Sequence, residues 1–251
     1  AYQLTNKVNG VSRGTQNGII FYIPAYLTSK IDPTTGFVDL LHPKYLSTEA
    51  SSAFFSRFDD IRYNGETDMF EFSFDYSNFD GGAASYRKKW IVCTNADRIR
   101  TFRNKEKNNE WDNETVILTE EFKKLFDEYG IDYKNDLKTQ IVKKNDKSFM
   151  ESLISLVRLT LQMRNSITGN VDVDYLISPV RNSDGEFYDS RKYSGSNAVL
   201  PTDADANGAY NIARKGLWAV EQIKNAADDE FEKCNIAISN SQWLEFAQKT
   251  T

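Results

Sequence analysis

IRYNGETDMFEFSFDY, residues Ile61–Tyr76, contains the clearest secondary-structure signal in the chain. Asn64 and Gly65 form a turn-favouring pair, and aromatic residues then alternate at Phe70, Phe72, Phe74 and Tyr76. Alternation with a period of two places these rings on one face of a strand, so the stretch predicts a β-hairpin with one buried face.

Strands and helices are expected on both sides of this hairpin without a regular βα alternation. Strands are expected at Asn17–Ile23, which Pro24 ends, and in KKWIVCTN (residues 88–95). Helices are expected at 47–58, at 119–129 with an end at Gly130, at 148–164 with a capping box of Ser148 and Glu151, from Asp205 to about Ile223, and near residues 241–249. Residues 185–197 read as a loop. This order predicts a mixed α+β fold.

Composition limits the classes of protein and of metal site. The 251 residues are 40% hydrophobic, enough for a sizeable core, and no apolar run approaches the ~20 residues of a membrane span, so no membrane partner is expected. Two distant cysteines, Cys93 and Cys234, exclude a cysteine-based zinc site and fit a reducing cytoplasm. The single histidine, His42, excludes multi-histidine sites, so a metal would need carboxylates, which favours magnesium, manganese or calcium.

DADANGAYNIAR, residues 203–214, begins like a calcium-binding EF-hand loop. Asp203, Asp205, Asn207 and Gly208 fit positions 1, 3, 5 and 6 of that loop. Position 12 requires a bidentate glutamate but is Arg214, and turn-forming residues instead of a helix precede the motif. The calcium interpretation is therefore rejected.

Asp205 is the more interesting of these acids because of its direction. A helix beginning there places Asp205 on one face with an apolar stripe that includes Ile212 and Val220, and Asp203 roughly opposite. We expect this stripe to face the core. An inward carboxylate at a helix start is explained either by N-capping or by ligation of a metal at a sheet edge, and spacing does not decide between the two.

Arg164 allows two similar interpretations. It closes its expected helix on the face of Leu153, so it is either a cation at a helix C-terminus or a partly buried guanidinium presented to a phosphate. Asn165 and Ser166 would add neutral donors, and Asp174 could orient the arginine.

Basic residues are concentrated between Arg87 and Lys107. Arg87, Lys88 and Lys89 are followed by five further cations, which suit either a solvated hairpin surface or a guide for single-stranded DNA. Tyr86 or Trp90 could stack on bases, although buried strand aromatics are the commoner case. The net charge of −5 argues weakly against nucleic acid as the main partner.

Four long motifs resemble one known family. They are YIPAYLTSKIDPTTGFVDLLHPKY (22–45), SLVRLTLQMRNS (155–166), YLISPVRNSDGEFYDSR (175–191) and DADANGAYNIARKG (203–216). Together they are similar to the C-terminal part of type V-A CRISPR RNA-guided DNA endonucleases. The resemblance implies the end of a RuvC II segment at 1–23, a Nuc domain at 24–201 and a RuvC III segment at 202–251, the outer two being remnants of an RNase H-like domain.

The resemblance also implies roles for individual residues. Asp205 matches the third catalytic acid of the RuvC site, a ligand of Mg²⁺ or Mn²⁺, and Arg164 matches an arginine needed for cutting the target strand. Asn165, Ser166 and Asp174 match its neighbours. The family's other two acids lie upstream of this chain, so we expect the isolated chain to be inactive, to hold no metal, and to expose the apolar face of the Asp205 helix.

The partners implied are the target and non-target DNA strands, the missing half of RuvC, and a guide RNA bound through the rest of the parent protein. The location implied is the bacterial cytoplasm. The alternative is a non-catalytic module that binds single-stranded DNA or presents an interface to a partner.

Overall fold

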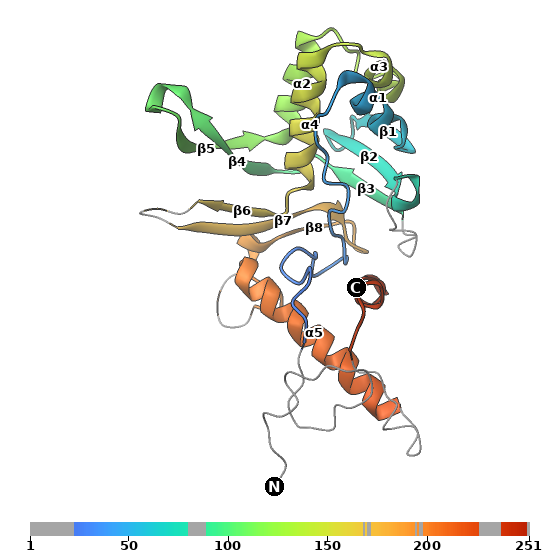
Figure 1. The fold of residues 1–251 in the computed structure, drawn as a ribbon, viewed down its shortest axis with the longest axis vertical. Coiled ribbons are helices and arrows are strands. Elements are labelled where there is room, and N and C mark those ends of the chain that lie inside the picture. Colours follow the sequence, from blue (N-terminus) through green and yellow to red (C-terminus); the bar gives the residue numbers. More distant parts are fainter. Residues whose placement is uncertain are drawn as a thin grey trace.

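The computed structural model describes residues 23–79, 89–167, 172–193, 198–225 and 237–249, together with Gly169 and Gly195. Within these ranges the chain forms six α-helices and three small antiparallel sheets (Figure 1). The predicted mixed α+β class is confirmed. The strand expected at Asn17–Ile23 and the side chains of Tyr86, Arg87 and Lys88 lie outside the described residues.

The predicted hairpin forms the centre of the first sheet. β1 (Asp60–Asn64) pairs with β2 (Met69–Asp75), which pairs with β3 (Lys89–Cys93). The connection is a four-residue loop over residues 65–68, in which the Asn64 side chain accepts the backbone N–H of Glu66 at 3.0 Å. Asp68 takes the left-handed conformation (φ 52°) that closes this loop.

Four helices pack against this sheet: α1 (Thr48–Ser56), α2 (Leu118–Glu128), α3 (Leu137–Lys143) and α4 (Lys147–Leu161). The alternating rings of β2 point into this core, where Phe70 contacts Phe122 and Phe126 at centroid distances of 5.4 and 5.1 Å. Each buried ring contributes about 1.5–3 kcal/mol relative to exposure. As predicted, α2 ends at Gly130, whose φ of 65° favours glycine.

The limits of α4 differ from those predicted at both ends. Asp146 caps the helix by accepting the backbone N–H of Phe149 at 2.9 Å, so the capping box of Ser148 and Glu151 is wrong. The helix ends at Leu161, and Arg164 begins a strand instead of closing the helix.

A long two-stranded hairpin projects from the body of the molecule (Figure 1). It consists of β4 (Asp97–Asn104) and β5 (Glu110–Ile117), joined by a 3₁₀ turn at Lys105–Lys107. The side chain of Trp111 on this hairpin is largely exposed. Most of residues 97–107, the second half of the basic segment, therefore lie on the surface of a hairpin, as one of the two interpretations predicted.

The third sheet contains β6 (Arg164–Ile167), β7 (Val173–Arg181) and β8 (Phe187–Asp189), in that order, followed by a 3₁₀ turn at Ser190–Lys192. The loop expected at 185–197 thus contains an edge strand and a turn. This strand is only three residues long and lies among turn-forming residues, so the sequence pattern did not indicate it.

The last two helices are α5 (Ala204–Asn225) and α6 (Asn240–Lys249), close to the predicted positions. The buried face of α5 is polar. Asn207, Asn211 and Lys215 donate to the carbonyls of Ile31, Thr28 and Pro24 at 2.9, 2.9 and 2.7 Å, and so hold residues 24–31 against the helix. No helix in the described part of the chain is both long enough and apolar enough to cross a membrane.

The apolar stripe of α5 does not face the core of this chain. Ile212 and Val220 are exposed, and Asp205 and Ala209 lie on the same accessible side. The inward direction predicted for this stripe is therefore wrong within the described residues.

Candidate functional site

Arg164 and Asp174 form an ion pair on one face of the third sheet. The guanidinium Nε and Nη2 of Arg164 lie 3.3 and 3.2 Å from the two carboxylate oxygens of Asp174, so the expected orienting contact is present. Ser166 is the register partner of Asp174, which places all three side chains on the same sheet face. The Arg164 side chain is 53% exposed, more than the partial burial predicted.

This ion pair is a weak constraint on the arginine. An exposed pair of this kind contributes about 0–1 kcal/mol, so little free energy opposes a change of partner. A phosphate could take one or both guanidinium donors, in the fork geometry that arginine offers to oxyanions.

The start of α5 lies on the same face of this sheet. Leu176 is the register partner of Arg164, and Leu176 packs in one cluster with Tyr188 and Ala204. Ala204 is the first residue of α5, and Asp205 follows it directly. The fold therefore brings Arg164 and the first turn of α5 to the same side of the third sheet, although 40 positions separate them in the sequence.

Asp203, and not Asp205, caps this helix. Its carboxylate accepts the backbone N–H of Ala206 at 2.7 Å. The N-cap explanation for Asp205 is thereby removed, and its side chain lies exposed on the first turn.

The described residues do not complete a metal site. Among them, no group of three histidine, cysteine, aspartate or glutamate side chains lies close enough to hold an ion. A two-metal nuclease site needs acids from several segments of a chain. The predicted Mg²⁺ or Mn²⁺ thus does not fit these residues alone.

Asn165 points to the opposite face of β6 and is fully buried. Its side-chain oxygen accepts the backbone N–H of Ile99 at 2.9 Å and the amide of Gln162 at 3.2 Å. Its own amide donates to the carbonyl of Met163 at 3.0 Å. This position corrects the expectation of a direct DNA contact by Asn165, which instead joins β6 to β4.

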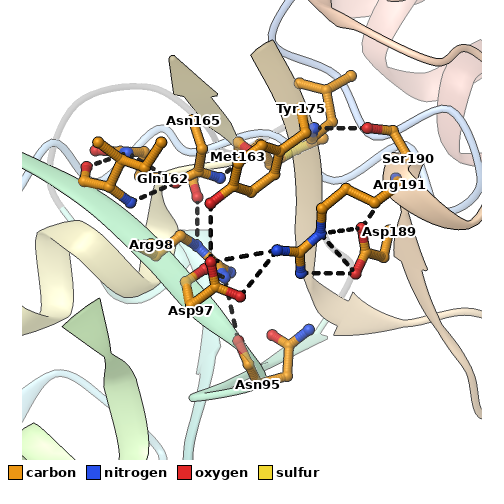
Figure 2. A network of polar contacts seen from close by, with 12 residues as sticks. Asn95, Asp97, Arg98, Gln162, Met163, Asn165, Tyr175, Asp189, Ser190 and Arg191 are labelled. Atoms are coloured by element: carbon orange, nitrogen blue, oxygen red, sulfur yellow. Dashed lines mark hydrogen bonds and ion pairs between the residues drawn. The ribbon is translucent and has the colours of Figure 1, made fainter. Parts of the chain in front are cut away.

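A network of charged and polar side chains surrounds Tyr175, the residue after Asp174 on β7 (Figure 2). The hydroxyl of Tyr175 donates to Asp97 at 2.8 Å, and the Arg191 guanidinium lies 4.5 Å from the Tyr175 ring centroid. Arg191 bridges two carboxylates, at 3.0 Å to Asp97 and 2.9 Å to Asp189. Figure 2 shows Arg191 reaching between these two acids.

The pKa values in this network follow from its contacts. Burial raises the pKa of Asp97, but hydrogen bonds from Tyr175 and Arg191 outweigh this effect and lower it overall. Burial and the hydrogen bond to Asp97 raise the pKa of Tyr175 to about 12. Asp97 therefore stays ionised and Tyr175 stays protonated near neutral pH, so the network keeps one charge state.

Arg98 is not part of a DNA-facing surface. It is fully buried and donates to the carbonyls of Gln162 and Asn95 at 2.7 and 3.1 Å. Burial lowers its pKa to about 10, so it remains a cation at neutral pH.

Two other cations of the basic segment have acidic partners on the hairpin. Arg100 pairs with Glu114, and Lys107 in the turn lies 2.9 Å from Asp112 on β5. The Arg103 guanidinium stacks 4.0 Å from the Trp111 ring centroid. Residues 97–117 contain five Lys or Arg and five Asp or Glu, so the β4–β5 hairpin has no net positive charge with which to guide DNA.

Lys89 and Trp90 begin β3 and point in opposite directions. The Lys89 side chain is 79% exposed, with Asp59 4.0 Å away, so it can reach a DNA strand. Trp90 is buried edge-to-face against Phe37 at 5.1 Å, which excludes it as an open stacking platform.

Sequence reasoning did not identify Asp97, Tyr175, Asp189 or Arg191. No local pattern marks them, since Asp97 and Arg191 are 94 positions apart and meet only through sheet packing. Asp189 and Arg191 did lie within a quoted motif, but their spacing suggested only a loop.

Comparison with known families identifies the class as a nuclease domain. A family model described as a nuclease domain, NUC, matches residues 31–192, well over half of the chain. The chain therefore belongs to the Nuc family, the Nuc domain of Cas12a-type nucleases. The match includes Arg164, Asp174 and the network of Figure 2, and it ends before α5 and Asp205.

Proposed function

We propose that this chain is part of an RNA-guided, metal-dependent DNA endonuclease of CRISPR immunity, and that its Nuc domain positions the target strand for cutting. The family match and the four long motifs support this function. The observation that carries it is the placement of exposed Arg164 on the same sheet face as the first turn of α5.

Each residue of this face has a separate role in the proposal. Arg164 binds a phosphate of the target strand, Asp174 orients the guanidinium, and Ser166 donates a hydrogen bond. Asp205 provides one carboxylate to a divalent metal, with the remaining acids supplied by other segments of the endonuclease. Asn165 positions β6 from behind and touches no DNA.

Binding of a fluorescein-labelled single strand to the 251-residue chain tests the role of Arg164. We expect Arg164→Gln to weaken binding about fivefold and to reduce the slope of log affinity against log salt by about 0.7, the value for one phosphate contact on a single strand. Arg158→Gln is the matched control, because Arg158 is also exposed but lies on α4. Equal effects of the two changes would show that only overall charge matters.

Cleavage in the assembled endonuclease tests Asp205. We expect the isolated chain to leave DNA intact with Mg²⁺ or Mn²⁺. In the assembly, Asp205→Ala abolishes cutting of both strands while target binding survives, and Arg164→Ala slows target-strand cutting more than non-target-strand cutting. Loss of binding with Asp205→Ala would show that the residue is structural, and equal slowing of both strands would refute a strand-specific Arg164.

The exposed stripe of α5 favours a second candidate function, that of a partner-interface module. Ile212 and Val220 are each over a third exposed on one face of α5, and Leu217, 62% exposed, extends this apolar surface beside Val220. Sedimentation at increasing concentration tests self-association through this stripe, and Leu217→Glu should abolish it. A single concentration-independent species would leave the DNA-positioning role as the better explanation.

A further inference from the structure

A pocket of about 430 Å³ lies where the first sheet meets the far end of β7. Its volume is within the ~300–1,000 Å³ of typical small-molecule sites. The residues that carry the inference are Thr34, Arg62, Lys89, Ile91, Arg181 and Asn182. In the sheet register, Arg62, Glu71 and Cys93 lie side by side, so the pocket uses the outer face of the sheet, opposite the aromatic core.

The charge of this pocket is opposite to that of the chain. Three cations line it, Arg62, Lys89 and Arg181, against one acid, Glu71. Glu71 is already bound by Arg62 at 2.7 Å and by the Asn64 amide at 2.8 Å. The lining therefore has an excess of two positive charges in a chain of net charge −5, which favours an anionic ligand.

Arg181 is held in place before any ligand binds. Its Nη1 donates to the carbonyl of Gly185 at 2.8 Å, and its guanidinium lies 4.4 Å from the Phe187 ring centroid. Fixing the guanidinium in advance reduces the entropy lost on binding. Ile91, 47% exposed, adds an apolar wall beside these cations. A cationic end and an apolar wall suit the phosphate and the sugar or base of one nucleotide.

The pocket and the Arg164–Asp174 pair lie at opposite ends of β7. Asp174 and Arg181 are seven residues apart on this strand, roughly 23 Å at ~3.3 Å per residue, and this odd spacing turns their side chains to opposite faces of the sheet. At ~3.4 Å per stacked nucleotide, about seven nucleotides cover the length alone, and a strand that contacts both residues also has to pass around the edge of the sheet.

We propose that this pocket binds one nucleotide of single-stranded DNA through its phosphate, as a second contact more than about seven nucleotides from Arg164. The proposal rests on the proposed DNA-positioning function and adds a site, a ligand class and a spacing to it.

Fluorescence anisotropy with labelled dT4, dT8 and dT12 and the full 251-residue chain tests the proposal. We expect affinity to rise between dT8 and dT12, when the strand becomes long enough to reach both contacts. Arg181→Gln should weaken dT12 binding about fivefold and remove most of this rise. Arg103→Gln is the matched control, since Arg103 stacks on Trp111 in the same manner but lies on the projecting hairpin. It should change neither quantity.

Lys89→Gln tests whether weaker binding by Arg181→Gln results from misfolding. The Lys89 side chain is 79% exposed, so this change preserves the fold, and it should also weaken dT12 binding. Normal dT12 binding by both Lys89→Gln and Arg181→Gln would overturn the pocket assignment. Competition by dTMP at concentrations as low as those of the strand would show a free-nucleotide site and would overturn the assignment to single-stranded DNA.

Arg164→Gln, measured beside Arg181→Gln, separates the two proposals. Weakened binding with Arg164→Gln alone would refute the pocket but retain the proposed function. Weakened binding with Arg181→Gln alone would retain the pocket and refute the role of Arg164. Unchanged binding in both variants would refute both.

Discussion

Replacement of Asn165 by alanine decides whether this residue is a DNA contact or a structural link. In the fold, the Asn165 side chain is fully buried and takes part in three hydrogen bonds, with Ile99, Gln162 and Met163. Asn165→Ala removes all three and leaves the buried backbone N–H of Ile99 without its acceptor.

The magnitude follows from these contacts. Each net hydrogen bond contributes about 0.5–1.5 kcal/mol, and an orphaned buried donor costs about 1–3 kcal/mol. Three bonds with partial relaxation around Ile99 therefore give a loss of about 3 kcal/mol in the free energy of unfolding. At the ~1–3 kcal/mol per molar typical of urea unfolding, the midpoint falls by roughly 1–3 M.

Urea unfolding followed by circular dichroism measures this loss, and Ser166→Ala is the control. Ser166 is the next residue on β6 but faces solvent, so its replacement should stay within about 0.5 kcal/mol. Single-strand binding by Asn165→Ala is measured below its unfolding transition and should stay close to that of the wild type.

The opposite pattern would refute the reasoning. If Asn165→Ala were as stable as Ser166→Ala and bound single-stranded DNA as weakly as Arg164→Gln, Asn165 would be a DNA contact. The buried geometry would then fail to describe the DNA-bound protein.

Three further comparisons test other parts of the fold. Burial lowers the pKa of Lys215 to about 8, against ~10.4 when unfolded, so the unfolded state binds more protons between these values. The free energy of unfolding of the wild type, relative to Lys215→Met, should therefore rise by roughly 2 kcal/mol from pH 7.5 to 9.5, as measured by denaturation at each pH. A Cβ at Gly36 would lie 2.6 Å from a backbone oxygen of α6, but one at Gly130 would meet nothing within 4 Å, and both residues have positive φ. Gly130→Ala should cost about 1–2 kcal/mol of backbone strain, and Gly36→Ala should cost more and expose α6 to limited proteolysis. Asp203→Ala should lower the free energy of unfolding by about 1 kcal/mol through loss of the N-cap, and Asp205→Ala should leave it unchanged in thermal unfolding.

Local elements were predictable where the sequence contains its own period or stop signal. The β1–β2 hairpin follows from the alternating rings of β2, and α2 ends at Gly130 as expected. The β6–β7 pairing was not predictable, because β6 has four residues and continues directly from an apolar helix. The alternation in β6 is too short to be distinguished from the end of the preceding helical pattern. The sequence therefore placed Arg164 in the helix instead of the strand.

The candidate site was predictable in residue type but not in direction. The motifs identified Arg164, Asp174 and Asp205, and the fold places the first two in contact. The same motifs grouped Asn165 with them, although alternation along β6 turns its side chain to the opposite face. Motif membership identifies a segment, and the pleat of the strand decides which side chain faces outward.

By itself, the sequence determined the fold class, the first hairpin, most helices and the family to which residues 31–192 belong. Local periodicity encodes the hairpin and the helices, because each depends on neighbours a few positions away, and the family follows from the long motifs. Only the tertiary structure decided that Arg164 shares a sheet face with the start of α5, and that Asp97 and Arg191 meet behind it. Contacts between residues separated by 40 to 94 positions depend on how sheets and helices pack, and no local pattern records that packing.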